Sequence, residues 1–392
     1  MNDAVQSLFR SVFGGGPAPV VRSAPGRVNL IGAHVDYNLG PVMPIALDRG
    51  TWVAVRPRAG RGRTARLVSR ERGAGGVHDL DALRRDAVDG WAAYPLGAVA
   101  ALAERGVEVG GFDLAVAADL DVGAGLSSSA SLLVAVLRAL DAAFGLGLAP
   151  AVHAELAFAA ETGFVGVSCG LMDPMACALA KPGHALRLDC RDRSIAHVPL
   201  DERLGVVLID SGTRRSLTDS SFNRRVAECR AAVDAIRRRR PDVESLRDAT
   251  LEDVEAAEVD DVVRRRARHV VEEIDRVARF EAALRAGDLA ECGRLVSACH
   301  ASLRERYEAS TVALDFLVER ACAIDGVFGA RLTGAGWGGN VLVLCARGAE
   351  SRVEAEVGPA YRDAFGRAAA FRPARVGAGP RDVSRRAAGP SP

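Results

Sequence analysis

The segment that most constrains this chain is Gly123–Ser131, GAGLSSSAS, which lies between a predicted strand and a predicted helix. The strand is predicted at Phe112–Ala118, and Ala130–Phe144 is so dense in Ala, Leu and Val that a buried helix is expected. Glycines let main-chain N–H groups approach a ligand closely, and a helix start adds oriented donors and a positive dipole end. This turn suits a triphosphate, although a small-residue turn with serine helix caps would have the same composition.

Two further glycine-rich segments can present polar groups to a small ligand. The first is Ala24–Asn38, APGRVNLIGAHVDYN, in which Arg27, His34 and Asp36 lie close to glycines. The second is Leu332–Asn340, LTGAGWGGN, with four glycines between two predicted strands. A turn with a surface ion pair and a plain hairpin are the structural alternatives for these two segments.

Two acidic residues, Glu161 and Asp173, flank the segment Gly163–Leu171. Isolated acidic residues usually lie on solvated faces, but Asp173 stands in the apolar stretch LMDPMACALA. A carboxylate in such surroundings needs a cation or hydrogen bonds to stay charged. Asp173 is therefore a candidate functional residue.

The composition excludes several classes of function. The 392 residues carry 51 Lys+Arg against 50 Asp+Glu, which argues against nucleic-acid binding, so the run Arg237–Arg240 is read as a solvated helix end. Lys181 is the one lysine of the chain, and it does not stand in a P-loop motif. The eight cysteines include no C-x-x-C pair, so neither structural zinc nor a disulfide framework is expected. Without a secretory signal at residues 1–20 or an apolar run of ~20 residues, we expect a soluble, cytoplasmic protein with no membrane partner.

The pattern of predicted elements suggests two domains, 1–200 and 201–392, since domains usually have roughly 100–200 residues. The first begins with strands, including one predicted at Val20–Ser23, and continues with helices around the serine-rich turn. The second opens on a buried strand and contains long amphipathic helices before its own glycine-rich loop. The elements expected there are a strand at Val206–Ile209, helices from near Phe222 and over Val254–Leu284, Leu289–Tyr307 and Val312–Ile324, strands at Gly329–Leu332 and Asn340–Leu344, and a frayed end at Gly377–Pro392.

Taken in order, the motifs resemble those of the galactokinase branch of the GHMP kinases, which phosphorylate small molecules from ATP. The resemblance covers nearly the whole chain and is carried by APGRVNLIG, GAGLSSSAS, CGLMD at Cys169–Asp173, HASLRERYEAS at His300–Ser310 and LTGAGWGGN. It implies an α+β fold of two domains with the active site in the cleft between them. It also implies an ATP- and Mg²⁺-dependent kinase that acts on the anomeric hydroxyl of galactose. We expect the protein to be a monomer, with the small sugar as its binding partner.

The resemblance assigns the catalytic pair to Arg27 and Asp173. Asp173 would accept the proton of the attacking hydroxyl, while Arg27 would keep Asp173 ionised and neutralise charge on the transferring phosphoryl group. An arginine that stabilises a carboxylate also weakens it as a base, so Asp173 can act more by positioning than by proton abstraction.

Other site residues also follow from the resemblance. Ser129 and Glu161 match the Mg²⁺ ligands of the family, and His34 and Asp36 match sugar contacts, with Asp36 accepting from vicinal hydroxyls. The ATP phosphates would be held by the turn residues Gly123, Ala124, Gly125, Leu126, Ser127, Ser128 and Ser129.

Two positions depart from the galactokinase pattern on the sugar side. Ala33 stands where galactokinases have Glu, near the sugar's primary hydroxyl, and Phe222 stands where they have a sugar-binding Tyr. Each lost hydrogen bond costs on the order of 0.5–1.5 kcal/mol. Because Ala33 also removes a charge that would repel a uronic acid, a galacturonokinase or another anomeric sugar kinase with altered recognition at C6 is an alternative. Galacturonokinases share the GAH sequence but differ from this chain in the DYN that follows.

Two other classes compete with a sugar kinase. A non-catalytic regulator that binds sugar and ATP is one, but the chain retains all four catalytic and Mg²⁺ positions of the family. A kinase for a non-sugar substrate, related to mevalonate or homoserine kinases, is the other, but DYN and HASLRERYEAS are galactokinase-branch features.

Overall fold

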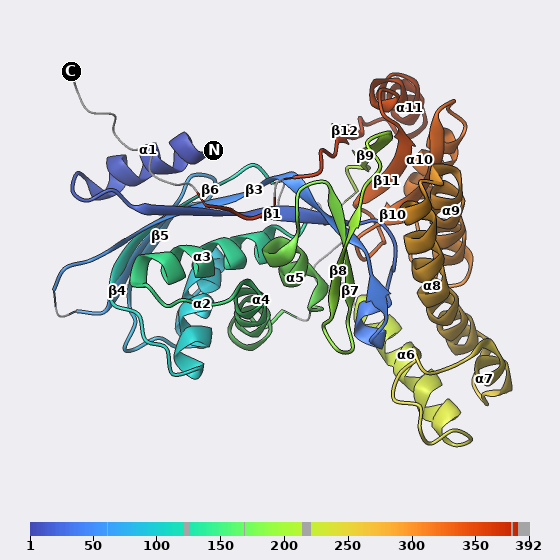
Figure 1. Ribbon diagram of the computed structural model, residues 1–392, viewed down its shortest axis with the longest axis horizontal. Coiled ribbons are helices and arrows are strands. Elements are labelled where there is room, and N and C mark those ends of the chain that lie inside the picture. The colour runs from blue at the N-terminus through green and yellow to red at the C-terminus, as the bar shows by residue number, and fades with distance from the viewer. Residues whose placement is uncertain (61, 121–124, 168, 214–220, 378, 383–392) are drawn as a thin grey trace.

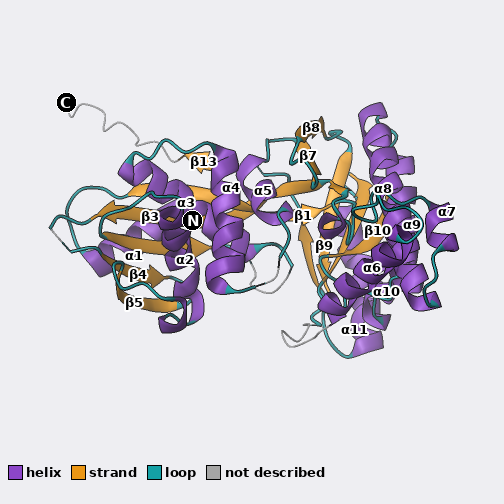
Figure 2. Ribbon diagram, turned by 90° about the horizontal axis from the view of Figure 1, so that it is seen from below, coloured by secondary structure: helices purple, strands orange, loops and turns teal. Residues whose placement is uncertain are grey.

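The computed structural model describes residues 1–392 except 61, 121–124, 168, 214–220, 378 and 383–392. It consists of two bodies of secondary structure that lie side by side along the longest axis (Figure 1). The first contains a large sheet with short helices, and the second contains a smaller sheet flanked by long helices (Figure 2). This mixed architecture agrees with the α+β class expected from the sequence.

Among the described residues, the larger sheet has nine strands in the order β13-β1-β3-β6-β4-β5, with β2, β7 and β8 attached through β3 and β7. Pairing is antiparallel except between β4 and β6. Helices α2 to α5 cover one face, and α1 packs on the other against β3 and β6 (Figure 1). The bounds are α1 Asn2–Phe13, β1 Val20–Asn29, β2 Pro41–Val42, β3 Pro44–Pro57, β4 Thr64–Ser69, β5 Gly73–Asp79, α2 Ala93–Glu104, β6 Phe112–Ala118, α3 Ser128–Phe144, α4 Pro150–Ala159, α5 Met172–Leu179, β7 His184–Asp189 and β8 Ile195–Pro199.

The smaller sheet is antiparallel with the order β10-β11-β9-β12. Helices α9 and α10 pack on β10, and α8 packs in turn on α9 and α6. The bounds are β9 Leu204–Asp210, α6 Ser221–Arg237, α7 Leu251–Ala256, α8 Asp261–Ala286, α9 Leu289–Glu305, α10 Val312–Cys322, β10 Val327–Thr333, β11 Asn340–Ala346, α11 Glu350–Phe365, β12 Ala370–Pro373 and β13 Arg381–Asp382.

Helix α3 forms the centre of the first body, as its composition predicted. Nine of its residues are buried, and it packs against both β1 and β3. Its first turn follows directly on the serine-rich segment, so the packing of this apolar helix fixes where that turn stands. The sequence therefore indicates both the helix and the position of its N-terminus.

Three sequence-based expectations need correction. The helix expected over Val254–Leu284 is two helices, α7 and α8, because α7 ends at Ala256 and the Asp260 side chain caps the start of α8 by accepting from the Val263 N–H. The strand predicted at Val20–Ser23 continues to Asn29, because residues 24–29 also pair with β3, with a register shift between Pro25 and Arg27. Of the end predicted to fray, Gly377–Pro392, residues 378 and 383–392 lie outside the described residues, and the rest returns to the first body: the Gly377 N–H donates to the Ala46 carbonyl, and β13 pairs with β1. Main-chain pairing of this kind leaves little trace in an Arg- and Gly-rich sequence.

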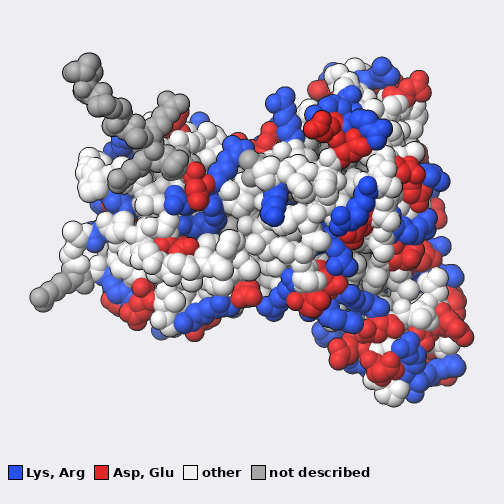
Figure 3. Space-filling model, in the orientation of Figure 1, with Lys and Arg blue, Asp and Glu red and all other residues white. Residues whose placement is uncertain are grey.

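Acidic and basic side chains are mixed over the face seen in Figure 3, most densely around the end that carries α6 and α7. This distribution matches the near-neutral balance of the chain. Within the described part of the chain, every helix is too short or too polar to cross a lipid bilayer.

Candidate active site

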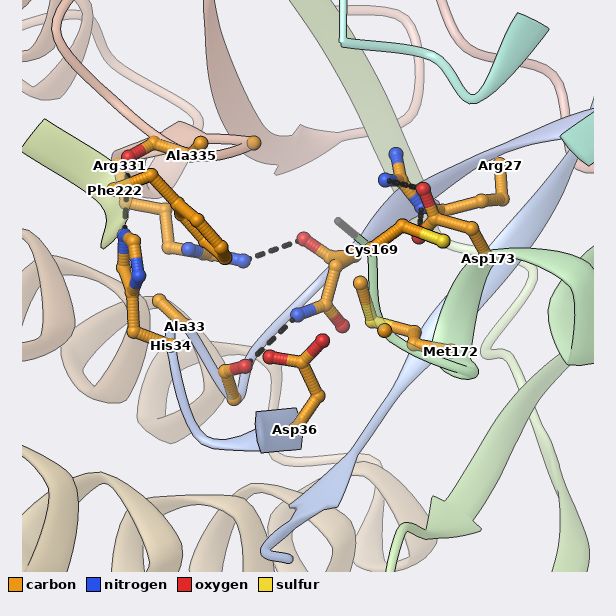
Figure 4. A pocket seen from close by; sticks show the side chains of 14 residues that line it. Arg27, Ala33, His34, Asp36, Cys169, Met172, Asp173, Phe222, Arg331 and Ala335 are labelled. Atoms are coloured by element: carbon orange, nitrogen blue, oxygen red, sulfur yellow. Dashed lines mark hydrogen bonds and ion pairs between the residues drawn. The ribbon is translucent and has the colours of Figure 1, made fainter. Parts of the chain in front are cut away.

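The glycine-rich segments near the N-terminus and after β10 meet at one cavity of about 220 Å³. Residues from both bodies line it, because Arg27 and Asp173 come from the first and Phe222 and Arg331 from the second (Figure 4). The expected cleft between two halves is therefore present at the place where the sequence motifs converge.

Arg27 and Asp173 are 146 positions apart in sequence and form a bidentate ion pair in this cavity. Arg27 Nε donates to Asp173 Oδ1 and Nη2 donates to Oδ2, both at 2.7 Å. Strand β1 carries the arginine, and the first turn of α5 carries the carboxylate. The Asp173 side chain remains 28% exposed against 8% for Arg27, so the carboxylate faces the cavity while the guanidinium lies behind it.

Ser127 also contacts the Arg27–Asp173 pair. Its Oγ donates to Asp173 Oδ2 at 2.6 Å, while Arg27 Nη1 donates to the Gly125 carbonyl at 2.7 Å. Ser127 has a left-handed conformation with φ of 57°, which turns the chain sharply just before α3 begins. The serine-rich turn is thereby tied to the carboxylate as well as to the helix start. The contact of Ser127 with Asp173 was not predicted from the sequence.

The structure describes only some of the remaining residues of the predicted phosphate-binding turn. Gly123 and Ala124 lie outside the described residues. Leu126 is buried, and its carbonyl accepts a hydrogen bond from the Arg27 N–H at 3.2 Å, so this residue is part of the support of the turn. Ser128 and Ser129 form the start of α3 and are partly exposed, where helix N–H groups can reach an anion.

The proposed magnesium ligands, Ser129 and Glu161, lie beside each other. Burial raises the pKa of Glu161, and a hydrogen bond from Ser129 acts against that rise. Glu161 lies in a π-helical turn, Ala160–Val165, a rare conformation that is frequent at functional sites. A hydroxyl and a carboxylate are hard oxygen donors, and they fit Mg²⁺, which keeps several waters and phosphate oxygens among its ligands.

Asp36 faces the cavity from a short 3-10 turn, Asp36–Asn38. Burial, reinforced by the charge of Asp173, raises the pKa of Asp36 to about 6. Gly170 passes so close that a Cβ there would lie 2.1 Å from Asp36 Oδ2. Any side chain in place of the glycine of CGLMD would therefore displace this carboxylate.

His34 lines the cavity, but both of its ring nitrogens are bonded within the protein. Nδ1 lies 3.0 Å from the Tyr37 hydroxyl, and Nε2 lies 3.0 Å from the Ala335 carbonyl. Because a carbonyl can only accept, Nε2 carries the proton and Nδ1 accepts from Tyr37. Burial lowers the pKa of His34 to about 3, so the ring is neutral at pH 7. His34 thus joins the Ala24–Asn38 segment to the loop after β10, and neither ring nitrogen is left for the predicted sugar contact.

Sequence reasoning missed Asn29, the last residue of β1. Its Nδ2 donates to the Gly32 carbonyl at 3.2 Å, while its Oδ1 is buried without a hydrogen-bond partner and Asn29 lines the cavity. A buried acceptor without a partner is costly, and a ligand hydroxyl would satisfy it. An asparagine inside a strand gives no such signal in the sequence.

A second cavity, of about 140 Å³, adjoins the start of α3 and was also missed. It is mostly apolar, and its lining includes Trp91, Tyr94 and Leu120 together with Ser128 and Ser129. The Trp91 Nε1 is buried and lacks a hydrogen-bond partner. Flat aromatic walls with one free donor beside a helix N-terminus suit a purine nucleotide.

The fold and this site define a kinase of the GHMP class. The GHMP kinase N-terminal domain matches residues 93–181, and the GHMP kinase C-terminal domain matches residues 280–363. The fold also resembles that of a Methanococcus jannaschii mevalonate kinase, with a TM-score of 0.66 at 16% identity over 92% of this chain and 99% of that chain. ATP use follows from membership of this class.

Within that class, the chain belongs to the galactokinase family. The galactokinase galactose-binding signature matches residues 7–57. A galactokinase of Roseiflexus is 42% identical over 371 residues, 93% of each chain, and one of Chloroflexus aurantiacus is 41% identical over 87% of each. The crystal structure of Lactococcus lactis galactokinase complexed with galactose matches with a TM-score of 0.91 at 34% identity, covering 97% of this chain and all of that one. The family and enzyme class expected from the sequence are confirmed.

Proposed function

We propose that this chain transfers the terminal phosphoryl group of ATP to the anomeric hydroxyl of galactose. The observation that carries the proposal is the Asp173 carboxylate, held by Arg27 and facing a cavity next to the turn that starts α3. An acceptor carboxylate and a guanidinium beside an anion-binding helix start are the groups that in-line phosphoryl transfer requires.

In the reaction, Asp173 orients the anomeric hydroxyl and accepts its proton as the new O–P bond forms. Arg27 neutralises charge on the transferring phosphoryl group from the same side. The Ser127 hydroxyl and Arg27 already donate to the carboxylate, which stabilises its charged form and makes it a weak base. Positioning of the hydroxyl is therefore the larger part of its role.

The nucleotide would lie with its base against Trp91 and its phosphates at the turn residues Gly125–Ser129, together with Gly123 and Ala124. Ser129 and Glu161 would hold Mg²⁺, which neutralises charge on the terminal phosphates when bound. The sugar would present hydroxyls to Asp36 and to Asn29 Oδ1, the acceptors left available in the cavity.

The test is Asp173→Asn, which keeps the size of the side chain and removes its charge. We expect turnover to fall by about 10²–10⁴, measured as galactose-dependent ADP release, while ATP binding measured by calorimetry stays near that of the unchanged enzyme. Asp192→Asn, on an exposed turn, is the matched control and should keep full activity. Activity of Asp173→Asn within tenfold of the unchanged enzyme would refute the role of Asp173.

The regulator alternative makes a different prediction in the same assay. A sugar- and ATP-binding protein without turnover would release no ADP with any sugar, yet calorimetry would still detect both ligands. Phosphorus NMR of the product then identifies the position of the phosphate. A product phosphorylated at a carbon other than the anomeric one would contradict the proposed reaction.

A further inference from the structure

The end of the sugar cavity farthest from Asp173 has an apolar wall. Ala33, Phe222 and Ala335 form it, and Figure 4 shows them opposite the Arg27–Asp173 pair. The Phe222 ring packs edge-on against Tyr37, with ring centroids 5.4 Å apart, and lies 6.0 Å from the His34 ring. None of the three wall side chains carries a polar atom.

The polar side chain next to this wall, His34, is already satisfied by a directed chain of hydrogen bonds. Because its Nδ1 accepts from the Tyr37 hydroxyl, the Tyr37 oxygen must in turn accept from Tyr307, 2.5 Å away. Cys229 Sγ lies 3.4 Å from the Tyr307 hydroxyl and can close the chain as its donor. Every proton in this series of hydrogen bonds already has an acceptor, so neither ring nitrogen of His34 is available to a ligand.

The main-chain groups of Gly32 and Ala33 are committed as well. The Gly32 and Ala33 N–H groups both donate to Glu273 Oε1, at 2.9 and 3.0 Å, and the Ala33 carbonyl accepts from His269 Nε2 at 3.2 Å. His269 can donate there because its Nδ1 is free to accept from Ser302 Oγ at 2.8 Å. Helix α8 thus occupies both N–H groups and the Ala33 carbonyl, and the Gly32 carbonyl accepts from Asn29 Nδ2, so residues 32 and 33 have no main-chain group left for a sugar.

The buried cation near the wall, Arg331, is also bound to the protein. Its side chain is 1% exposed, and each of its three nitrogens donates to a main-chain carbonyl. Nε donates to Leu30 at 2.9 Å, Nη1 to Leu332 at 3.1 Å and Nη2 to Asn29 at 2.6 Å. The acceptors that the described residues leave available in the cavity, Asp36 and Asn29 Oδ1, are not part of this wall.

We infer that this enzyme does not recognise the hydroxyl at C6, so that 6-deoxy-D-galactose is as good a substrate as galactose. The inference rests on the proposed function, which places the anomeric hydroxyl at Asp173 and the vicinal ring hydroxyls at Asp36. The exocyclic carbon is then the group left to face Ala33 and Phe222. A methyl group suits such a wall, whereas a hydroxyl there loses its hydrogen bonds to water without replacement.

The ratio of kcat/KM for the two sugars distinguishes a site that binds the C6 hydroxyl from a site that faces C6 with an apolar wall. A site built to bond a substrate hydroxyl rejects the analogue that lacks it by about 10⁴–10⁵, whereas an apolar pocket discriminates against an added hydroxyl by about 10² at most. For this enzyme we therefore expect kcat/KM for 6-deoxy-D-galactose to equal or exceed that for galactose, by up to about 100-fold.

The experiment compares kcat/KM for galactose, 6-deoxy-D-galactose and galacturonate by ADP release from the full chain. A preference for galactose over the deoxy sugar above about tenfold would overturn the inference, because that is the value of one hydrogen bond to the C6 hydroxyl. A preference for galacturonate would also overturn it, because a carboxylate would then have a partner at the wall. Failure to phosphorylate any of the three sugars would refute the proposed function itself.

Two variants test where the selectivity arises. Ala33→Glu adds an acceptor at the wall and should raise the ratio of galactose to deoxy-sugar kcat/KM by tenfold or more. If circular dichroism shows that the Ala33→Glu protein is unfolded, Phe222→Tyr is used in its place, because it adds a hydroxyl to the same wall. Asp36→Asn is the matched control, since it should weaken both sugars equally and leave the ratio unchanged. An unchanged ratio in a folded wall variant would contradict the inference.

Discussion

Asp36→Asn should make this enzyme more stable and less active at neutral pH. In the folded protein, burial and the charge of Asp173 raise the pKa of Asp36 from 3.8 to about 6. Each pKa unit corresponds to about 1.36 kcal/mol, so holding this carboxylate ionised costs the fold about 3 kcal/mol at pH 7.5. Asparagine has nearly the same shape and no charge, and it should recover that free energy.

The pH dependence has a definite sign. Between pH 3.8 and 6 the folded state holds a proton on Asp36 that the unfolded state has lost, so folding stability falls as the pH rises through this window. The gain from Asp36→Asn is therefore full above pH 6, and it should shrink to about 1 kcal/mol at pH 4.5. In the proposed function the ionised Asp36 carboxylate accepts from the sugar hydroxyls, so kcat/KM of the unchanged enzyme should fall below pH 6.

The assay is urea unfolding followed by tryptophan fluorescence at pH 7.5, 6 and 4.5. The control is Asp86→Asn: Asp86 is on the surface, and a hydrogen bond from Arg84 lowers its pKa, so removing its charge should give no gain. An Asp36→Asn protein no more stable than the parent at pH 7.5, or a gain that persists undiminished at pH 4.5, would refute this reasoning.

Three further predictions concern groups around the two cavities. Ser127→Ala removes the 2.6 Å hydrogen bond to Asp173 and should lower kcat by about 10- to 100-fold with the KM for ATP little changed, measured by steady-state kinetics. Trp91→Phe removes an unpaired donor from the smaller cavity, so the KM for ATP should rise about 2- to 10-fold while that for galactose stays constant. Glu273→Gln breaks a fully buried ion pair with Arg276 and should destabilise the protein by about 3–5 kcal/mol in urea unfolding; a loss below 1 kcal/mol would contradict it.

The sequence predicted several features of the site because they follow from local composition. The apolar run of α3 and the glycines and serines before it indicated a helix start able to bind an anion, and the structure has that helix. The convergence of Arg27 with Asp173 was expected only through the family resemblance, since nothing in either segment alone points to the other. That Arg27 lies on a strand was not anticipated.

The sequence analysis missed three residues for the same reason: Asn29, Trp91 and Arg331. The neighbouring sequence of each residue gives no functional signal. The role of each depends on whether its polar atoms find hydrogen-bond partners in the folded protein. Asn29 Oδ1 and Trp91 Nε1 are buried without partners, whereas all three nitrogens of Arg331 find main-chain carbonyls. Pairing of this kind depends on segments hundreds of residues apart.

By itself, the sequence determined the family, the reaction class and the residues that bear charge, because those depend on residue type and local order. Only the tertiary structure decided which of these groups remain available to a ligand. His34 is the clearest case: its sequence position suggests a sugar contact, but Tyr37 and the Ala335 carbonyl occupy both ring nitrogens. A ring nitrogen that is hydrogen-bonded within the protein is not available to a ligand, and the fold determines which partner it has.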